Sequence, residues 1–440
     1  MAAGLVKMLS LNEYYRRRLI FIRPACVLAF LCFLTLAFSP ALKAQDYRTF
    51  RSDLESIKER ANWTLGPFRI DPSLQFDLSH DSSVYGTYGT QEPVPDYIAS
   101  VALPITVYLP FHDRLILSLT DRPQYLYFFD LKDERSFNNS YSLEARLLLL
   151  NRLVLSGEYG FDRAKYRFSS EIERRTFQQI ESSSGSLFLE TARETAIGVI
   201  GSSSRYTYED EILPGGETPL SASLNRKEDS VRLEFYRQVF VDGSFFLNFG
   251  FTDYTFLNPQ SRHRDSYSYQ ANAGIRFPLL GRARGLLSLG YKNLIPRGPD
   301  RKRFSGPVGN TSLDFRFTRF NLRFQLLRDA PFSYYIDSIF FIENRLGAGL
   351  SFYLARFLRL DYDFSYGRSE YPETMLIPLP DGSELEALRE DTYRSHSASA
   401  VFRVIRNIGI GMRASYVDRR SNYLYNMDRW IAGLFLIYDF

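Results

Sequence analysis

Side chains that could do acid–base or metal chemistry are few in this sequence. The four histidines are His80, His112, His263 and His396. Only His396 has hydroxyl neighbours beside it, Ser395 and Ser397, but neighbours along a strand point to opposite faces, so neither pairs with it as a nucleophile with its base. No two histidines have metal-ligand spacing. We therefore expect no enzyme activity, no bound metal and no cofactor.

Two loop features also fall short of a chemical site. The acidic run Glu209-Asp210-Glu211 does not space its carboxylates at alternate positions around a glycine turn, as an EF-hand calcium loop does. Gly215-Gly216 lacks the strand–helix setting that makes glycines a phosphate cradle. Both features are typical of solvated loops.

Charged residues recur at alternate positions inside otherwise apolar segments. Their strand neighbours, such as Leu143, Leu233 and Met412, would face an apolar medium, so the charged side chains would face a polar one. Mixed charge of this kind suits a water-filled channel better than a strong ion filter. The arginines could hold acidic sugars, or the Arg–acid pairs could only brace the wall. The predicted lumen-lining residues are Arg146, Arg232, Arg316, Arg323, Arg359, Arg413, Glu144, Glu234, Asp314, Asp361 and Asp363.

The elements that must position these side chains are β-strands, because the hydrophobic period from Phe68 onward is two. The alternation predicts an all-β fold, a single antiparallel up-and-down transmembrane β-barrel of about 18 strands. The predicted strand cores are 68–80, 97–109, 114–128, 140–150, 152–162, 177–190, 194–208, 229–239, 244–255, 266–277, 284–293, 309–318, 320–328, 333–353, 356–368, 392–405, 408–419 and 429–440.

The connections between these strands alternate in length, which separates a membrane barrel from a soluble sandwich. Short ones such as 110–113 and 406–407 alternate with long polar ones such as 209–228 and 369–391. Outer-membrane barrels have short periplasmic turns and longer outer loops. One expected outer connection, 329–332, is short, and the segment after it could hide two strands. The expected strand number therefore ranges from 16 to 20.

Residues 1–44 differ from the rest of the chain. Arginines precede an apolar run from Ala25 to Phe38, which small residues follow, and this pattern predicts a secretory signal peptide. Cleavage after Ala41 and cleavage after Ala44 both remain open, and an uncleaved N-terminal membrane anchor is the alternative. Both cysteines, Cys26 and Cys32, lie in this segment. Without its six basic residues and one acid, the remaining chain carries 48 basic and 49 acidic residues, so nothing predicts nucleic-acid binding.

The two ends of the expected mature chain have separate roles. Residues 45–65 are expected to form a periplasmic N-terminal arm, or alternatively a helix that plugs or lines the pore entrance; residues 66–440 form the barrel. The chain ends on a strand with apolar residues at alternate positions, which resembles the C-terminal motif by which outer-membrane barrels are recognised for assembly. The residues of this predicted assembly signal are Trp430, Leu434, Leu436, Tyr438 and Phe440.

Two stretches suggest a family. The segment Phe304-Ser305-Gly306-Pro307-Val308 and the strand exit Tyr366-Gly367-Arg368 resemble outer-membrane β-barrel porins encoded with exopolysaccharide synthesis and export genes. The resemblance implies a channel in exopolysaccharide export across the outer membrane of a Gram-negative bacterium. It also implies partners: outer-membrane lipid, the barrel-assembly machinery, polysaccharide and periplasmic export components. A general or solute-specific porin, and a barrel enzyme or structural protein, are the alternatives.

Overall fold

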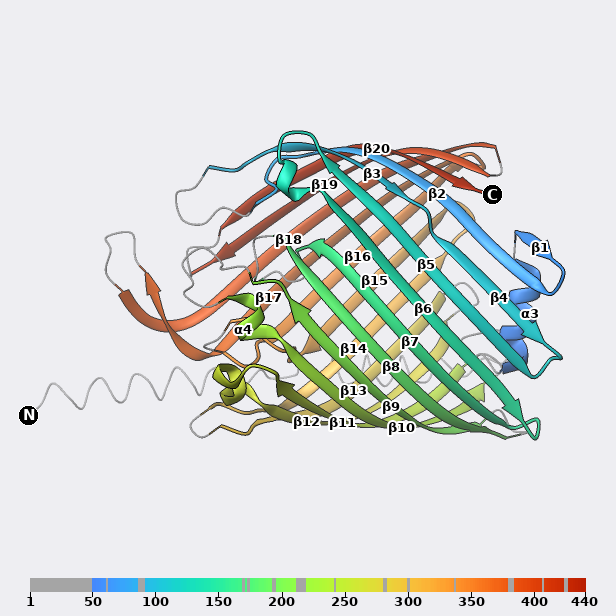
Figure 1. Cartoon of the computed structure of the whole chain (residues 1–440), viewed down its shortest axis with the longest axis horizontal. Helices are drawn as coiled ribbons and strands as arrows, with labels where there is room; N and C mark the ends of the chain where they lie inside the picture. The colour runs from blue at the N-terminus through green and yellow to red at the C-terminus, as the bar shows by residue number, and fades with distance from the viewer. Residues whose placement is uncertain are drawn as a thin grey trace, which may run out of the picture. The chain divides into compact units, whose positions relative to one another are not determined.

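The structure is a computed structural model and is dominated by antiparallel strands (Figure 1). It describes residues 50–60, 62–85, 92–167, 171, 175–191, 195–210, 219–240, 243–279, 283–298, 301–335, 338–378, 384–405, 407–422 and 426–440. The predicted signal peptide lies outside the described residues. No described helix is long and apolar enough to cross a membrane.

Successive wall strands pair with one another along the chain, so the sheet is a meander. The helices are α3 (Phe50–Arg60) and α4 (Leu220–Leu224), with short 3-10 turns η1 (Lys132–Glu134) and η2 (Pro259–Arg264). The strands are β1 (Trp63–Leu65), β2 (Phe68–Asp81), β3 (Asp96–Ala102), β4 (Ile105–Phe111), β5 (Leu115–Phe128), β6 (Ser136–Leu149), β7 (Leu153–Tyr166), β8 (Thr176–Glu190), β9 (Thr195–Tyr208), β10 (Arg226–Phe240), β11 (Gly243–Phe256), β12 (Ser266–Leu279), β13 (Ala283–Pro296), β14 (Phe304–Arg316), β15 (Phe320–Asp329), β16 (Ile342–Ala355), β17 (Leu358–Pro378), β18 (Glu384–Ile405), β19 (Ile408–Ser421) and β20 (Met427–Asp439).

The sheet closes on itself, because β2 pairs antiparallel with the last strand, β20. β1 only forms a small hairpin with β2. β3 and β4 are two halves of one wall strand: both pair with β2 and with β5. The break falls at Leu103-Pro104, where proline offers no N–H for the ladder. Eighteen wall strands result, so the predicted 18-stranded antiparallel barrel is confirmed, and each predicted strand core falls on one of them.

The outer connections depart from the prediction in three places. The β15–β16 connection is not the short 329–332 but runs from 330 to 341, and 333–353 contains only one wall strand, β16. Most of the expected loop 369–391 is instead a long hairpin of β17 and β18. Phe304–Val308, assigned to a loop, opens β14. In the last two cases the ladder continues past the apolar alternation, because backbone pairing does not require a membrane.

The wall has an apolar outer face and a polar inner face. Leu143, Leu233 and Met412 are 53%, 51% and 60% exposed. Their strand neighbours point to the opposite side of the sheet. Outward residues are exposed here because lipid, rather than protein, would cover them. The pleat therefore assigns every other wall residue to the lumen.

Helix α3 packs against the lumen side of the wall. Its Phe50 and Leu54 are buried in a cluster with Ile116, Leu148 and Val154. These three wall residues lie on the face opposite the exposed Leu119, Leu143 and Leu155. Polar contacts add to the packing: the Phe50 N–H donates to Glu190 Oε1 (3.3 Å), and Lys58 Nζ pairs with Asp113 (2.7 Å) in the β4–β5 turn. A short helix of this kind needs a partner, and the wall supplies it.

Candidate functional site

Most of the predicted lumen charges form ion pairs. Arg232 Nη1 lies 3.2 Å from Glu234 Oε1, and Arg359 Nε lies 2.9 Å from Asp361 Oδ2. Each pair joins residues two apart on one strand, which the pleat places on one face. Arg323 pairs with Asp314 (3.3 Å) across two strands in register. Pairing of this kind supports the bracing interpretation, while solute contact by these residues stays a prediction.

The remaining predicted charges divide into two groups. Arg146 pairs with Glu144 on its own strand and with Asp53 of α3 (2.5 Å), which ties the helix to the wall. Arg316 and Asp363 form no ion pair within the described residues. Their assignment to the lumen rests only on the alternation of side chains along each strand.

A charge that the sequence analysis missed joins the barrel seam. Arg413 on β19 reaches across β20 to Asp77 on β2, with 2.8 Å between Nη2 and Oδ2. Gly433 of β20 lies between them in the register, opposite both Arg413 and Ser79. A Cβ at Gly433 would lie 2.7 Å from Ser79 Cβ, so a side chain there would obstruct the crossing. Asp77 alternates with apolar residues along its strand, as the predicted lumen charges do, and this alternation could have identified it as a lumen residue.

Serines cover the opposite arc of the lumen. Ser156 and Ser186 are 2.5 Å apart between their hydroxyl oxygens, and Ser202 and Ser230 are 2.7 Å apart. The same face carries further hydroxyls: Ser140, Ser142, Ser182, Ser184 and Ser204. These hydroxyls lie on β6–β10, whose inner face also carries the Arg146–Glu144 and Arg232–Glu234 pairs. The inner face of this arc therefore combines hydroxyls with paired charges.

The β15–β16 connection folds into the barrel. Ile339 and Phe340, which are almost fully buried, pack on Leu294, Phe304 and Val308 of the inner wall. We call residues 330–341, of which 336 and 337 are not described, the inner loop. The inner loop also contacts other strands of the barrel wall.

Two consecutive tyrosines of the inner loop contact opposite parts of the wall. The Tyr334 ring lies 6.4 Å from that of Tyr208 on β9, and the Tyr335 ring lies 6.2 Å from that of Tyr371 on β17. β9 and β17 are eight places apart in a ring of eighteen. The inner loop therefore crosses the lumen at the end that carries the long connections.

Buried charges hold the inner loop. Arg264 is fully buried and donates to the carbonyl oxygens of Ser333 (2.5 Å), Ser338 (3.4 Å) and Ser223 (2.9 Å). Glu171, from the β7–β8 connection, accepts from Ser333 Oγ (2.7 Å) and from the Tyr334 N–H (2.8 Å). Burial raises the pKa of Glu171 above its usual range, although these donors and the charge of Arg389 oppose the shift.

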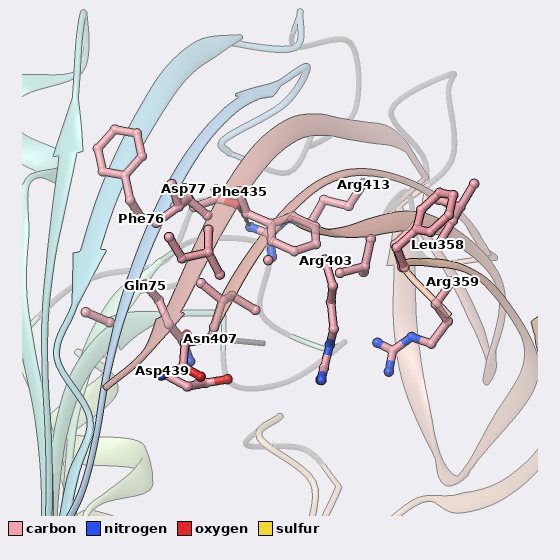
Figure 2. A pocket seen from close by; sticks show the side chains of 18 of the residues that line it. Gln75, Phe76, Asp77, Leu358, Arg359, Arg403, Asn407, Arg413, Phe435 and Asp439 are labelled. Carbon is pink, nitrogen blue, oxygen red and sulfur yellow. Dashed lines mark ion pairs between the residues drawn. The ribbon is translucent and has the colours of Figure 1, made fainter. Parts of the chain in front are cut away.

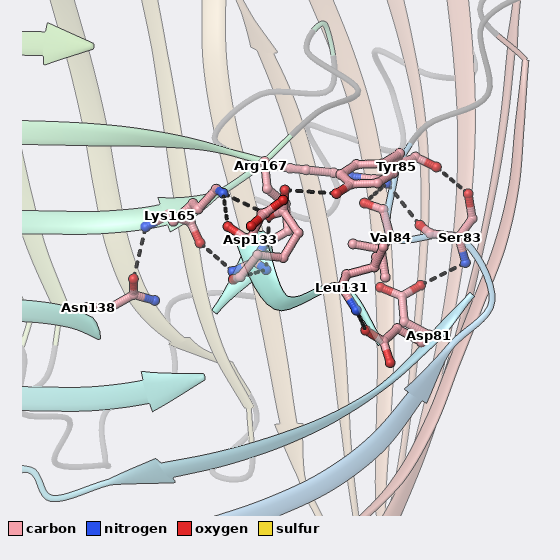
Figure 3. Close-up of polar contacts among 12 residues, drawn as sticks. Asp81, Ser83, Val84, Tyr85, Leu131, Asp133, Asn138, Lys165 and Arg167 are labelled. Carbon is pink, nitrogen blue, oxygen red and sulfur yellow. Dashed lines mark hydrogen bonds and ion pairs between the residues drawn. The ribbon is translucent and has the colours of Figure 1, made fainter. Parts of the chain in front are cut away.

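Neighbouring outer connections are also joined to one another (Figure 3). Glu134 accepts from the Tyr85 hydroxyl (3.0 Å) and pairs with Lys165 (3.2 Å) and Arg175 (3.5 Å). Arg167 donates to the carbonyl oxygens of Ser83 and Val84. These bonds link three connections, β2–β3, β5–β6 and β7–β8, into one cap.

A cavity of about 740 Å³ opens inside the lumen at the end of the tight turns (Figure 2). Its wall comes from β2, β3, β5, β16, β17, β18, β19 and β20. Charged side chains that line it are Arg356, Arg359, Arg403, Arg413, Asp77 and Asp439. Arg403 was not selected from the sequence, although it continues the inward alternation of Ser397, Ser399 and Val401.

The histidines occupy separate places. His396 lies on the outer face, where its Nδ1 is 2.8 Å from the Tyr362 hydroxyl. His80 packs between the rings of Tyr97 and Trp430. In the described part of the chain no three His, Cys, Asp or Glu residues gather as metal ligands.

The predicted assembly residues lie in the closing strand. Trp430 and Leu434 are exposed on the outer face of β20. Phe440 follows the strand; its N–H donates to the Pro72 carbonyl (3.3 Å), and its ring lies 5.6 Å from that of Trp63. A role for these residues in recognition by the assembly machinery stays a prediction.

Comparison with known proteins identifies one family. A family model described as "Putative beta-barrel porin 2" matches residues 61–434. The chain is similar to the Pseudomonas aeruginosa proteins OpdQ (TM-score 0.48, 11% identity, covering 85% of this chain and 97% of that one) and OccK2 (OpdF) (TM-score 0.49, 10% identity, 84% and 97%). It is also similar to the siderophore receptor PirA of Acinetobacter baumannii (TM-score 0.45, 7% identity, 84% and 80%). The comparison with curated proteins found no match.

Proposed function

Because this chain belongs to the family described as putative β-barrel porin 2, we propose that it is an outer-membrane channel that takes part in exopolysaccharide export. The barrel and the family establish a porin-like fold of the outer-membrane type. The export role and the Gram-negative outer membrane as its location are the proposed part.

The observation that carries the proposal is that the lumen wall offers both hydroxyls and guanidinium groups. Hydroxyls such as Ser156 and Ser186 can exchange hydrogen bonds with sugar hydroxyls along one arc, in place of water. Elsewhere on the wall, guanidinium groups such as that of Arg359 can bind carboxylates and stack on sugar rings. A chain of sugars could pass along a wall of this composition without losing hydrogen bonds. The sequence resemblance around Phe304–Val308 supports the same cargo.

The inner loop favours a second candidate, a general or solute-specific porin. By crossing the lumen, residues 330–341 narrow it and would select small solutes. Polysaccharide export would then require the inner loop to move. The two candidates differ in cargo and not in architecture.

Deleting the gene in a polysaccharide-producing host separates them. If the chain exports polysaccharide, the deletion strain accumulates polymer in the periplasm and loses it from the medium, and the wild-type gene restores secretion. Unchanged secretion, together with slower uptake of small sugars, would support the porin candidate. Periplasmic export components are expected as partners in the first case only.

A further inference from the structure

We propose that the cavity at the tight-turn end of the lumen is a binding site for a carboxylate-bearing sugar, with Arg403 as its anion anchor and Phe435 as its stacking surface. The choice of a sugar as ligand rests on the proposed function. The existence of an anion site rests on the geometry of β18, β19 and β20.

Among the arginines that line the cavity, Arg356 and Arg403 have no acid partner in the described part of the chain, and Arg403 is the one on a wall strand, β18. Arg413 is paired with Asp77, and Arg359 with Asp361. The Arg403 guanidinium has no hydrogen bond or ion pair with any residue in the described part of the chain. Figure 2 shows it extending from the wall into the open cavity. A guanidinium that no acid neutralises can hold an anionic ligand through two parallel hydrogen bonds.

Two glycines beside Arg403 leave a floor on which a ring could lie. Gly409 is opposite Arg403 in the register, and Gly411 is opposite Val401. A Cβ at Gly409 would meet only Val401, at 3.7 Å, so the space above it is open. A Cβ at Gly411 would lie 2.3 Å from the Phe435 ring, which therefore covers that glycine. The ring thus lies along the wall next to the open floor, where an apolar face of a sugar could stack on it.

The other side of the cavity supplies groups for sugar hydroxyls. Gln75, Asn407 and Asp439 line it together (Figure 2). Asp439 accepts hydrogen bonds from hydroxyls but repels a carboxylate, so it orients the ligand with its acid group toward Arg403. The cavity volume, about 740 Å³, lies within the range of roughly 300–1,000 Å³ that is usual for ligand sites.

Equilibrium binding to the folded protein in detergent tests the site without requiring ion conduction. Isothermal titration would compare trigalacturonate with the neutral maltotriose. We expect trigalacturonate to bind about tenfold more tightly than maltotriose. Arg403→Gln should lower the affinity for trigalacturonate by about tenfold and leave the affinity for maltotriose unchanged. Phe435→Leu should lower the affinity for both sugars, because stacking on the ring does not depend on the charge of the sugar.

Arg122→Gln is the matched control, since Arg122 faces the lumen from β5 but does not line the cavity. Arg403→Lys keeps the charge and should retain part of the affinity. Heat-modifiable migration shows that each variant barrel is folded. Equal affinity of the wild type for the two sugars would contradict the proposed site. An equal loss of affinity for trigalacturonate in the Arg122 and Arg403 variants would also contradict it. Selective binding with unchanged secretion in the deletion strain would instead refute only the export role.

Discussion

The side chain of Arg413 passes over a neighbouring strand to reach Asp77, with 2.8 Å between Nη2 and Oδ2. The strand that it crosses, β20, is the last of the barrel, and Asp77 belongs to the first wall strand, β2. The ion pair therefore adds a side-chain link to the backbone hydrogen bonds that close the ring. Gly433 makes the crossing possible because it has no side chain toward the lumen.

Neutralising this link should weaken closure. Asp77→Asn is expected to lower the free energy of unfolding by about 1 kcal/mol, since Asp77 is largely buried but Arg413 is half exposed. Urea titration of the folded, heat-modifiable form measures the change. Asp229→Asn is the control, because the Lys227–Asp229 pair lies on one strand and both residues are half exposed. Equal effects of the two variants would show that the seam pair has no special role.

Shortening the inner loop should widen the path. Replacing residues 331–341 with a short glycine–serine turn removes the crossing at Tyr334 and Tyr335 while leaving the wall pairing of β15 with β16. We expect single-channel conductance in planar bilayers to rise about twofold or more, because the narrowest part of a pore sets its resistance. A folded variant with wild-type conductance would show that the loop does not limit the path.

Docking of the inner loop should depend on pH through Glu171. Its pKa is raised by burial, so the docked state favours the protonated carboxyl. The stabilisation is fully present below the ordinary value of 4.5 and is lost as the pH rises through the raised pKa. Conductance should therefore increase with pH over that interval.

Glu171→Gln keeps an acceptor for the Tyr334 N–H but cannot ionise. Its conductance is expected to stay low and constant with pH. A pH response in this variant equal to that of the wild type would assign the effect to another group.

The register of the wall can be tested with single cysteines. Cysteine at position 359 should react with a small charged thiol reagent added in water, and cysteine at 360 should not, because the two side chains point to opposite faces of β17. Mass spectrometry of the folded protein measures the labelling. Cys26 and Cys32 lie in the predicted signal, so a cleaved chain offers no competing thiol. Preferential labelling at 360 would reverse the assignment of lumen and lipid faces.

The wall was predictable because each strand carries its own pattern. The alternation around Arg359 or Leu233 depends only on the pleat, and so each predicted strand core falls on a wall strand. The loop that crosses the lumen was not predictable, because Tyr334 and Tyr335 find their partners on β9 and β17, far away in the sequence.

The ion pairs also differ in whether local sequence can predict them. Arg232 and Glu234 are two residues apart, and their pairing can be read from spacing. Asp77 and Arg413 meet only because the ring closes, which depends on the partner of the first strand. Arg403 was overlooked because the lack of an acid paired with it, within the described residues, is a property of the packed wall and not of local spacing.

Release of sugar chains from sealed vesicles tests the account most directly. The folded protein would be reconstituted into liposomes that contain a fluorescent acidic oligosaccharide, and external fluorescence would be followed over time. A channel for such chains predicts release that requires folded protein and accelerates when the inner loop is shortened. Complete retention by vesicles that contain folded barrels, with the inner loop intact and with it shortened, would contradict the proposed channel.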